Sequence, residues 1–144
     1  MPVQATFRCP VCGRFNRVQA GRAGPSCGAC QAALDVSGAP IHLDDDGLQR
    51  LVQHSPVPVL VDFYADWCAP CRSLAPSLVE LGRRHAGRLL VAKVDTDKHP
   101  RTAGQLGVRG IPALYLYQAG RVVDQRAGAV PLSELEGMVG PRLG

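Results

Sequence analysis

The sequence predicts a mixed α/β sheet with helices on both faces, preceded by a small cysteine-rich module. Strands and helices alternate from residue 39 to residue 106, and a hairpin follows at 113–126, which is typical of such a sheet. The first 38 residues hold two C-x-x-C pairs and few large apolar side chains, so they cannot fold by apolar burial alone. We therefore predict a four-cysteine module at 1–38 and an α/β domain at 39–144.

The first elements of the α/β domain follow from apolar spacing and helix-start signals. Residues 39–43 are a possible short strand. A helix is expected at 44–55, because the acids from Asp44 to Asp46 suit its amino end. The nearly continuous apolar run at 57–65 predicts a strand that is buried on both faces. Apolar side chains at helical spacing then predict a helix over 67–85.

The second half of the domain continues the alternation and ends in a hairpin. The expected elements are a strand at 88–95, a helix at 100–106, hairpin strands at 113–118 and 122–126, and a closing helix at 131–139. Gly107 can terminate the short helix, since glycine readily adopts the left-handed conformation found there. Ala119, Gly120 and Arg121 separate the hairpin strands.

Composition and charge narrow the function classes. The net charge of +4 is mild, and most of it comes from the first 40 residues, which carry Arg8, Arg14, Arg17 and Arg22 against Asp35. We expect a solvated face there, not a nucleic-acid patch. No apolar run approaches the roughly 20 residues of a membrane helix, and the first ten residues lack the apolar region of a secretory signal. A cytoplasmic protein is expected, whose six cysteines are metal ligands or redox groups.

The segment 61–71, VDFYADWCAPC, places a C-x-x-C pair between a strand and a helix. Cys68 would lie at the helix amino end, where the dipole and free N–H groups stabilise the reactive thiolate. Cys71 would lie one turn further along the same face and could resolve a mixed disulfide. Asp62 lies inside the apolar strand, where burial raises a carboxyl pKa and allows proton exchange with Cys71.

Several motifs together resemble the thioredoxin family: Asp62, then Trp67-Cys68-Ala69-Pro70-Cys71, then Pro76 inside the helix, and Ile111-Pro112 before a strand. Thioredoxins usually carry Gly where this chain has Ala69. The resemblance implies a thioredoxin fold over residues 39–144 and a protein-disulfide reductase, in which Cys68 attacks and Cys71 resolves. It also implies a cis Ile111–Pro112 bond, Lys93 as the buried partner of Asp62, and a substrate groove formed by Trp67, Ala69, Pro70, Ile111, Pro112 and Gly128.

The first module approximates a zinc ribbon. Cys9 and Cys12 are separated by 14 residues from Cys27 and Cys30. Four thiolates form the preferred structural Zn²⁺ site, and one bound ion would supply the folding energy that the small core lacks. We expect Gly13 and Gly28 to allow the tight turns of the two pairs. A rubredoxin-like iron site and labile disulfides remain alternatives.

The two parts together resemble the zinc-binding thioredoxin 2 group. That resemblance implies a cytoplasmic reductase of protein disulfides, re-reduced by the NADPH-dependent flavoenzyme thioredoxin reductase. We expect a monomer without membrane or nucleic-acid partners. An oxidase or isomerase is one alternative, although such enzymes more often carry His between the cysteines. Another is a nucleic-acid or protein-binding zinc module on a thioredoxin scaffold. Separately, Cys68 and Cys71 could be inert buried thiols or half of a metal site.

Overall fold

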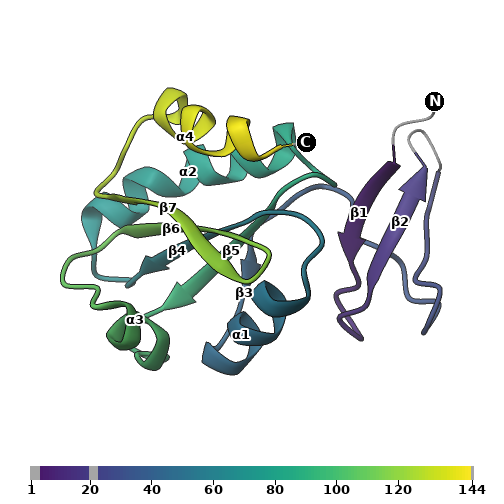
Figure 1. Ribbon diagram of the computed structural model, residues 1–144, viewed down its shortest axis with the longest axis horizontal. Coiled ribbons are helices and arrows are strands. Elements are labelled where there is room, and N and C mark those ends of the chain that lie inside the picture. The colour runs from purple at the N-terminus through teal and green to yellow at the C-terminus, as the bar shows by residue number, and fades with distance from the viewer. Residues whose placement is uncertain (1–3, 20–22, 144) are drawn as a thin grey trace.

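The computed structural model describes residues 4–19 and 23–143, which form two separate β-sheets (Figure 1). Strands β1 (Gln4–Arg8) and β2 (Phe15–Gln19) pair as an antiparallel hairpin. The second sheet has the strand order β3-β5-β4-β6-β7. Arg22 lies outside the described residues. So do residues 1–3 of the predicted cysteine-rich module and residue 144 at the end of the predicted α/β domain.

The second sheet is mixed, as predicted. Its strands are β3 (Ile41–His42), β4 (Val59–Tyr64), β5 (Leu90–Asp95), β6 (Ala113–Gln118) and β7 (Arg121–Ala127). Its helices are α1 (Asp45–His54), α2 (Ala69–Arg84), α3 (Arg101–Leu106) and α4 (Leu132–Val139), followed by the 3-10 turn η1 (Gly140–Arg142). Strands β3, β4 and β5 run parallel, whereas β6 is antiparallel to both β4 and β7.

Helices cover both faces of this sheet, and the central strand β4 separates two apolar clusters. Val61 and Phe63 face the cluster that contains the apolar side chains of α1 and Ala103 of α3. Leu60 faces the other cluster, which contains the apolar side chains of α2 and α4. Because side chains alternate along a strand, Asp62 points to the same side as Leu60, toward α2. None of the helices described is long and apolar enough to cross a membrane.

Several predicted boundaries shift by a few residues for identifiable reasons. Helix α2 begins at Ala69 because Cys68 has extended dihedral angles and serves as its N-cap. The strand predicted at 39–43 is reduced to Ile41–His42. Strand β7 begins at Arg121, since Ala119 and Gly120 both have positive φ angles, as a two-residue type I′ hairpin turn requires.

The cysteine-rich hairpin packs against the connection between α2 and β5, at the opposite end of the molecule from the amino end of α2 (Figure 1). The Thr6 N–H donates a 2.8 Å hydrogen bond to the Gly87 carbonyl. The cysteine-rich module has its own small apolar cluster, which contains Phe7 and Val18 of the hairpin and Leu34 further along the chain. Ala86 packs against this cluster. The first module is therefore held in place by backbone and apolar contacts with the second sheet's domain.

Candidate active site

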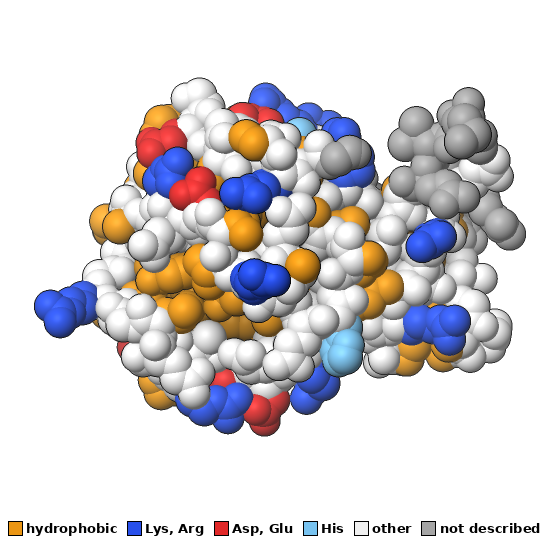
Figure 2. Space-filling view, in the orientation of Figure 1, with side chains coloured by type: hydrophobic (Ala, Val, Ile, Leu, Met, Phe, Trp, Pro, Cys, Tyr) orange, Lys and Arg blue, Asp and Glu red, His pale blue; other side chains and the backbone are white. Residues whose placement is uncertain are grey.

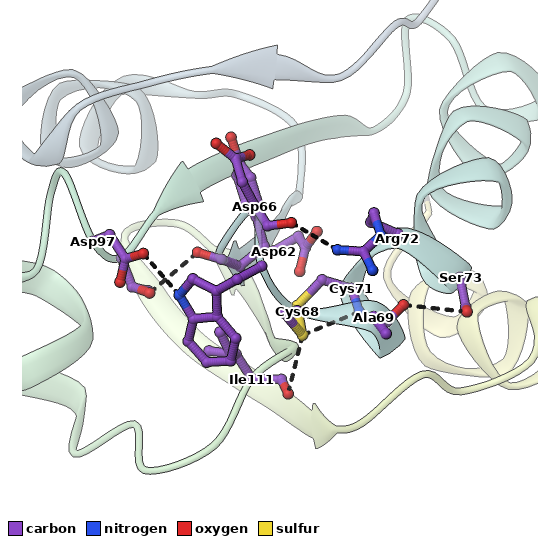
Figure 3. The surroundings of a disulfide bond; sticks show 12 residues. Asp62, Asp66, Cys68, Ala69, Cys71, Arg72, Ser73, Asp97 and Ile111 are labelled. Carbon is purple, nitrogen blue, oxygen red and sulfur yellow. Dashed lines mark hydrogen bonds between the residues drawn. A yellow bond between two sulfur atoms is a disulfide. The ribbon is translucent and has the colours of Figure 1, made fainter.

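Cys68 and Cys71 are joined by a disulfide at the first turn of α2 (Figure 3), with their Cα atoms 5.2 Å apart. The Cys71 N–H donates a 3.2 Å hydrogen bond to the Cys68 sulfur, so Cys68 caps the helix. Pro70 fits within the first turn, where a missing N–H leaves no bond unmade. Both sulfur-bearing residues are buried, with 4% of Cys68 and 3% of Cys71 exposed.

The Ile111–Pro112 loop lies directly against the disulfide. Its peptide bond is cis, as the resemblance implied, and the Ile111 carbonyl oxygen lies 3.7 Å from the Cys68 sulfur. Gly128, whose φ is 87°, donates its N–H to the Pro112 carbonyl at 2.9 Å. The structure thus brings together three segments that are distant in sequence: the C-x-x-C turn, the loop before β6 and the residue after β7.

A groove of about 550 Å³ opens beside Cys68. Its apolar walls include Trp67, Pro70, Ala103, Val108 and Ile111. Figure 2 shows hydrophobic side chains exposed on the neighbouring surface, between the β6–β7 hairpin and α3. An open apolar groove with a reactive disulfide in its wall can hold an extended polypeptide segment.

Trp67 is 68% exposed and its orientation is set by a hydrogen bond. The indole Nε1–H donates to the Asp97 Oδ2 at 2.8 Å, as the dashed line at Asp97 in Figure 3 shows. Sequence reasoning missed Asp97. Its position two residues after β5 was the available signal, since ligand-binding side chains gather beyond the carboxyl ends of parallel strands.

Asp62 is fully buried beneath the disulfide turn, and its cross-strand partner on β5 is Lys93. The Lys93 Nζ lies 3.8 Å from the Asp62 Oδ2, and neither carboxylate oxygen accepts a hydrogen bond from the described residues. Burial raises the pKa of Asp62 to about 6, although the Lys93 charge opposes this shift. The Lys93 side chain is only 13% exposed, so it is not a freely solvated charge.

The acidic run at the start of α1 stabilises helix starts, as predicted. Asp44 is the N-cap of α1 and accepts the Gly47 N–H at 2.7 Å. Asp45 caps a different helix, because its carboxylate accepts the N–H groups of Arg101 and Thr102 at the first turn of α3. This second capping role was not predicted.

The four remaining cysteines converge on one point. All four sulfurs lie within 4.8 Å of one another, and the Cys9–Cys30 and Cys12–Cys27 sulfur pairs are each 3.6 Å apart. A tetrahedral Zn²⁺ with Zn–S bonds of about 2.3 Å places its ligands about 3.8 Å apart. The sulfur positions therefore fit one tetrahedral metal ion.

Backbone N–H groups prepare this cluster for a cation. The N–H of Cys30 is the main cause that lowers the pKa of Cys27 to about 6. A backbone N–H bond from Ala32 favours the Cys30 thiolate, yet burial and the three neighbouring sulfurs together raise its pKa to about 11. Four thiolates this close need a positive charge among them to ionise together.

The prediction about Gly28 was wrong. Gly13 has a φ of 82° and closes the turn that contains Cys9 and Cys12, with its N–H donating to the Cys9 carbonyl. In the turn that contains Cys27 and Cys30, Gln31 occupies the equivalent position: its φ is 65° and its N–H donates to the Cys27 carbonyl. Gly28 has no positive φ, and its N–H bonds instead to the Asn16 side chain. The left-handed residue follows the second cysteine of each pair, which sequence reasoning placed correctly only once.

Comparison with known proteins agrees with this geometry. The family model for thioredoxin matches residues 39–140. Thioredoxin 1 of Nostoc sp. is 43% identical over 97 residues, which cover 67% of this chain and 91% of that protein. The thioredoxin of Acidithiobacillus ferridurans is 40% identical over 108 residues, 75% of this chain and all of that protein.

A solved structure shows the same fold. A mutant thioredoxin from Halobacterium salinarum superposes with a TM-score of 0.70 at 30% identity, covering 76% of this chain and 96% of that one. The match to residues 39–140 contains the disulfide turn, the buried acid and the cis-proline loop. From residue 39 onward, the chain belongs to the thioredoxin family of thiol–disulfide oxidoreductases.

Proposed function

We propose that this chain reduces disulfides in extended segments of other proteins, with Cys68 as nucleophile, Cys71 as resolving thiol and Asp62 as the base. The contact between the Cys68 sulfur and the Ile111 carbonyl carries the proposal, because it puts the reactive sulfur beside a backbone group that can bind a peptide. In the reduced enzyme, the Cys71 N–H and the amino end of α2 stabilise the Cys68 thiolate.

The reaction balances as two thiol–disulfide exchanges. The Cys68 thiolate attacks one sulfur of the substrate disulfide, a mixed disulfide forms, and the other substrate sulfur leaves as a thiolate. Asp62 then accepts the Cys71 proton, and the Cys71 thiolate attacks the Cys68 sulfur. The second substrate sulfur leaves, and the Cys68–Cys71 disulfide remains. Two electrons have moved from the enzyme dithiol to the substrate.

Substrate binding is assigned to the groove beside Cys68. Trp67, Ala69, Pro70, Ile111 and Pro112 would contact the segment that carries the substrate cysteine, and Gly128 would hold the loop of Pro112 through its N–H. Lys93 would keep a positive charge near Asp62. The oxidised enzyme needs two electrons from outside, and a thioredoxin reductase that draws on NADPH in the cytoplasm is the proposed donor.

The module at residues 1–38 is proposed to hold one structural Zn²⁺ through Cys9, Cys12, Cys27 and Cys30. The spacing of the sulfurs supports this assignment, as does the small apolar cluster of the hairpin, which offers little folding energy. All four ligands are protein thiolates, so no coordination position is left for substrate. The module also lies away from the disulfide, and zinc takes no part in the exchange.

The direct test is insulin reduction with a dithiol reductant as electron source. We expect Cys68→Ser to abolish turnover, whereas Cys71→Ser should accumulate a mixed disulfide that mass spectrometry detects. A Cys68→Ser variant with full activity would refute the reductase assignment and favour a binding module. Metal analysis should find one zinc per chain in wild type and in Cys68→Ser, and a Cys12→Ser variant should lose it.

A further inference from the structure

Asp62 belongs to a row of polar side chains that crosses the sheet from solvent to the core. His42 on β3 is the register partner of Lys93 on β5, and Lys93 is the register partner of Asp62 on β4. Register partners on adjacent strands face the same side of a sheet, so all three side chains share one face. Exposure falls along the row, because His42 is exposed, Lys93 is half-buried and Asp62 is buried.

Tyr64 contacts two members of this row, Lys93 and His42. It lies two residues after Asp62 on β4 and therefore points to the same face. The Lys93 ammonium sits over its ring, 4.6 Å from the centroid. The Tyr64 hydroxyl lies 3.4 Å from Nδ1 of His42, and the two rings meet edge to face with centroids 6.2 Å apart.

The ammonium of Lys93 has several competing partners nearby. A depression of about 250 Å³ reaches Lys93, and the charged or titratable groups lining it are His42, Asp44, Tyr64, Asp95, Lys98 and His99. Asp66, after β4, is another carboxylate whose charge reaches Tyr64. Without the aromatic ring, Asp95 and Asp44 could draw the ammonium outward. The ring face offers about 1 kcal/mol of attraction at a partly desolvated site, which is enough to bias the Lys93 side chain.

The depression is separate from the substrate groove, and none of the described residues lines both. A protein bound in the groove covers the entrance at Trp67 and Cys68 but leaves the His42 side open. Lys93, which lines the depression and whose side chain is 13% exposed, therefore stays within reach of solvent while a mixed disulfide occupies the groove.

We propose that Tyr64 and His42 are positioning residues for the resolving step. They hold the Lys93 ammonium beside Asp62, at the inner end of the depression that is separate from the substrate groove. This inference rests on the proposed role of Asp62 as base. A nearby ammonium favours the ionised carboxylate, which is the form that can take the Cys71 proton.

The test is the pH dependence of mixed-disulfide resolution, followed by stopped-flow fluorescence between about pH 4.5 and 9, a range that brackets the raised pKa of a catalytic carboxyl base. Tyr64→Leu should move the acidic limb of the pH–rate profile to higher pH by about half a unit to one unit. The reason is that the Lys93 ammonium is no longer held beside the Asp62 carboxylate. Tyr64→Phe keeps the ring and should shift the limb less. His42→Leu should resemble Tyr64→Phe, and combining the two should add nothing, because both remove the same contact.

Tyr115→Leu is the matched control, as it removes a half-buried tyrosine ring that packs edge to face on Phe63 in the same sheet. It should leave the acid limb in place. A Tyr64→Leu limb that coincides with wild type would overturn the positioning role, even if the rate falls equally at every pH. Asp62→Asn tests the base role of Asp62 separately from the positioning role of Tyr64 and His42. If this variant leaves the acidic limb of the profile unchanged, the assignment of Asp62 as base fails.

Discussion

Gly38 and Gly82 touch through their backbones, where the connection from the cysteine-rich hairpin crosses α2. A Cβ at Gly82 would clash with the Gly38 carbonyl oxygen, and a Cβ at Gly38 would clash with the Gly82 carbonyl oxygen. Gly38 also has a φ of 78°, which glycine adopts without strain. Helical propensity alone favours alanine over glycine at position 82, so the close approach explains the residue found there.

Gly82→Ala should therefore destabilise the protein by about 1–3 kcal/mol, because the new methyl group must push the connection off α2. Urea unfolding at neutral pH measures the change. Gly137→Ala in α4 is the control, since no atom of the described residues lies within 4 Å of the added Cβ position. It should stabilise by about 0.5–1 kcal/mol through helix propensity. Equal effects of the two variants would mean that the contact with Gly38 has no energetic consequence.

Asp62→Asn should stabilise the oxidised protein at neutral pH. The pKa of Asp62 is raised to about 6 in the folded state, above its ordinary value near 4, so its contribution to stability is lost as pH rises between these values. Removing the charge should raise the free energy of unfolding by about 2–3 kcal/mol above pH 6 and leave it unchanged below about pH 4. Urea unfolding at both pH values provides the comparison. A gain that is the same in acid and at neutral pH would contradict this linkage.

The hydrogen bond between Trp67 and Asp97 should affect protein substrates selectively. Asp97→Ala leaves the indole without its acceptor, and we expect KM for insulin to rise about five-fold, as for the loss of one hydrogen bond. Reduction of a small aromatic disulfide should hardly change. Trp67 is the chain's single tryptophan, so its fluorescence reports the altered orientation directly.

Asp66→Ala is the matched control for Asp97→Ala, because it also removes one carboxylate from a loop next to Trp67. The Asp66 side chain forms no hydrogen bond with any of the described residues, and its backbone carbonyl accepts from Arg72. KM for insulin should stay near the wild-type value in this variant. A matching rise in both variants would assign the effect to charge and not to the indole.

The β6–β7 turn carries a residue that is poorly suited to its conformation. Ala119 has a φ of 53°, which costs a residue with a Cβ about 1 kcal/mol relative to glycine. Ala119→Gly should raise the unfolding free energy by up to about 1 kcal/mol, less the added freedom of the unfolded chain. Ala129→Gly, at an exposed position without positive φ, should instead destabilise slightly. Thermal unfolding of the two variants should move Tm in opposite directions.

Local patterns in the chain were enough to locate most elements and the reactive cysteines. A strand buried on both faces shows as an apolar run, so β4 and the burial of Asp62 inside it could be predicted directly. The position of Cys68 at a helix start follows from its neighbours alone. These features depend on residues within one or two turns of each other, and short-range sequence spacing encodes them well.

Contacts that join distant segments depended on the order of strands in the sheet. The order β3-β5-β4-β6-β7 differs from the order along the chain, and it brings His42, Lys93 and Asp62 into one row. It also places the Ile111 carbonyl against the Cys68 sulfur, 43 residues away in sequence. The resemblance to thioredoxins anticipated Lys93 and Pro112, but neither Asp97 nor the pairing of Tyr64 with His42.

The cysteine-rich module shows the same division between local and long-range information. The two C-x-x-C pairs predict a four-thiol cluster because each pair aims its sulfurs at a common point. The left-handed backbone at Gln31 and the packing of Thr6 on Gly87 could not be predicted in this way. Glutamine gives no sequence signal for the left-handed conformation, which glycine favours, and the Thr6 contact joins segments remote in the chain that meet only in the folded protein.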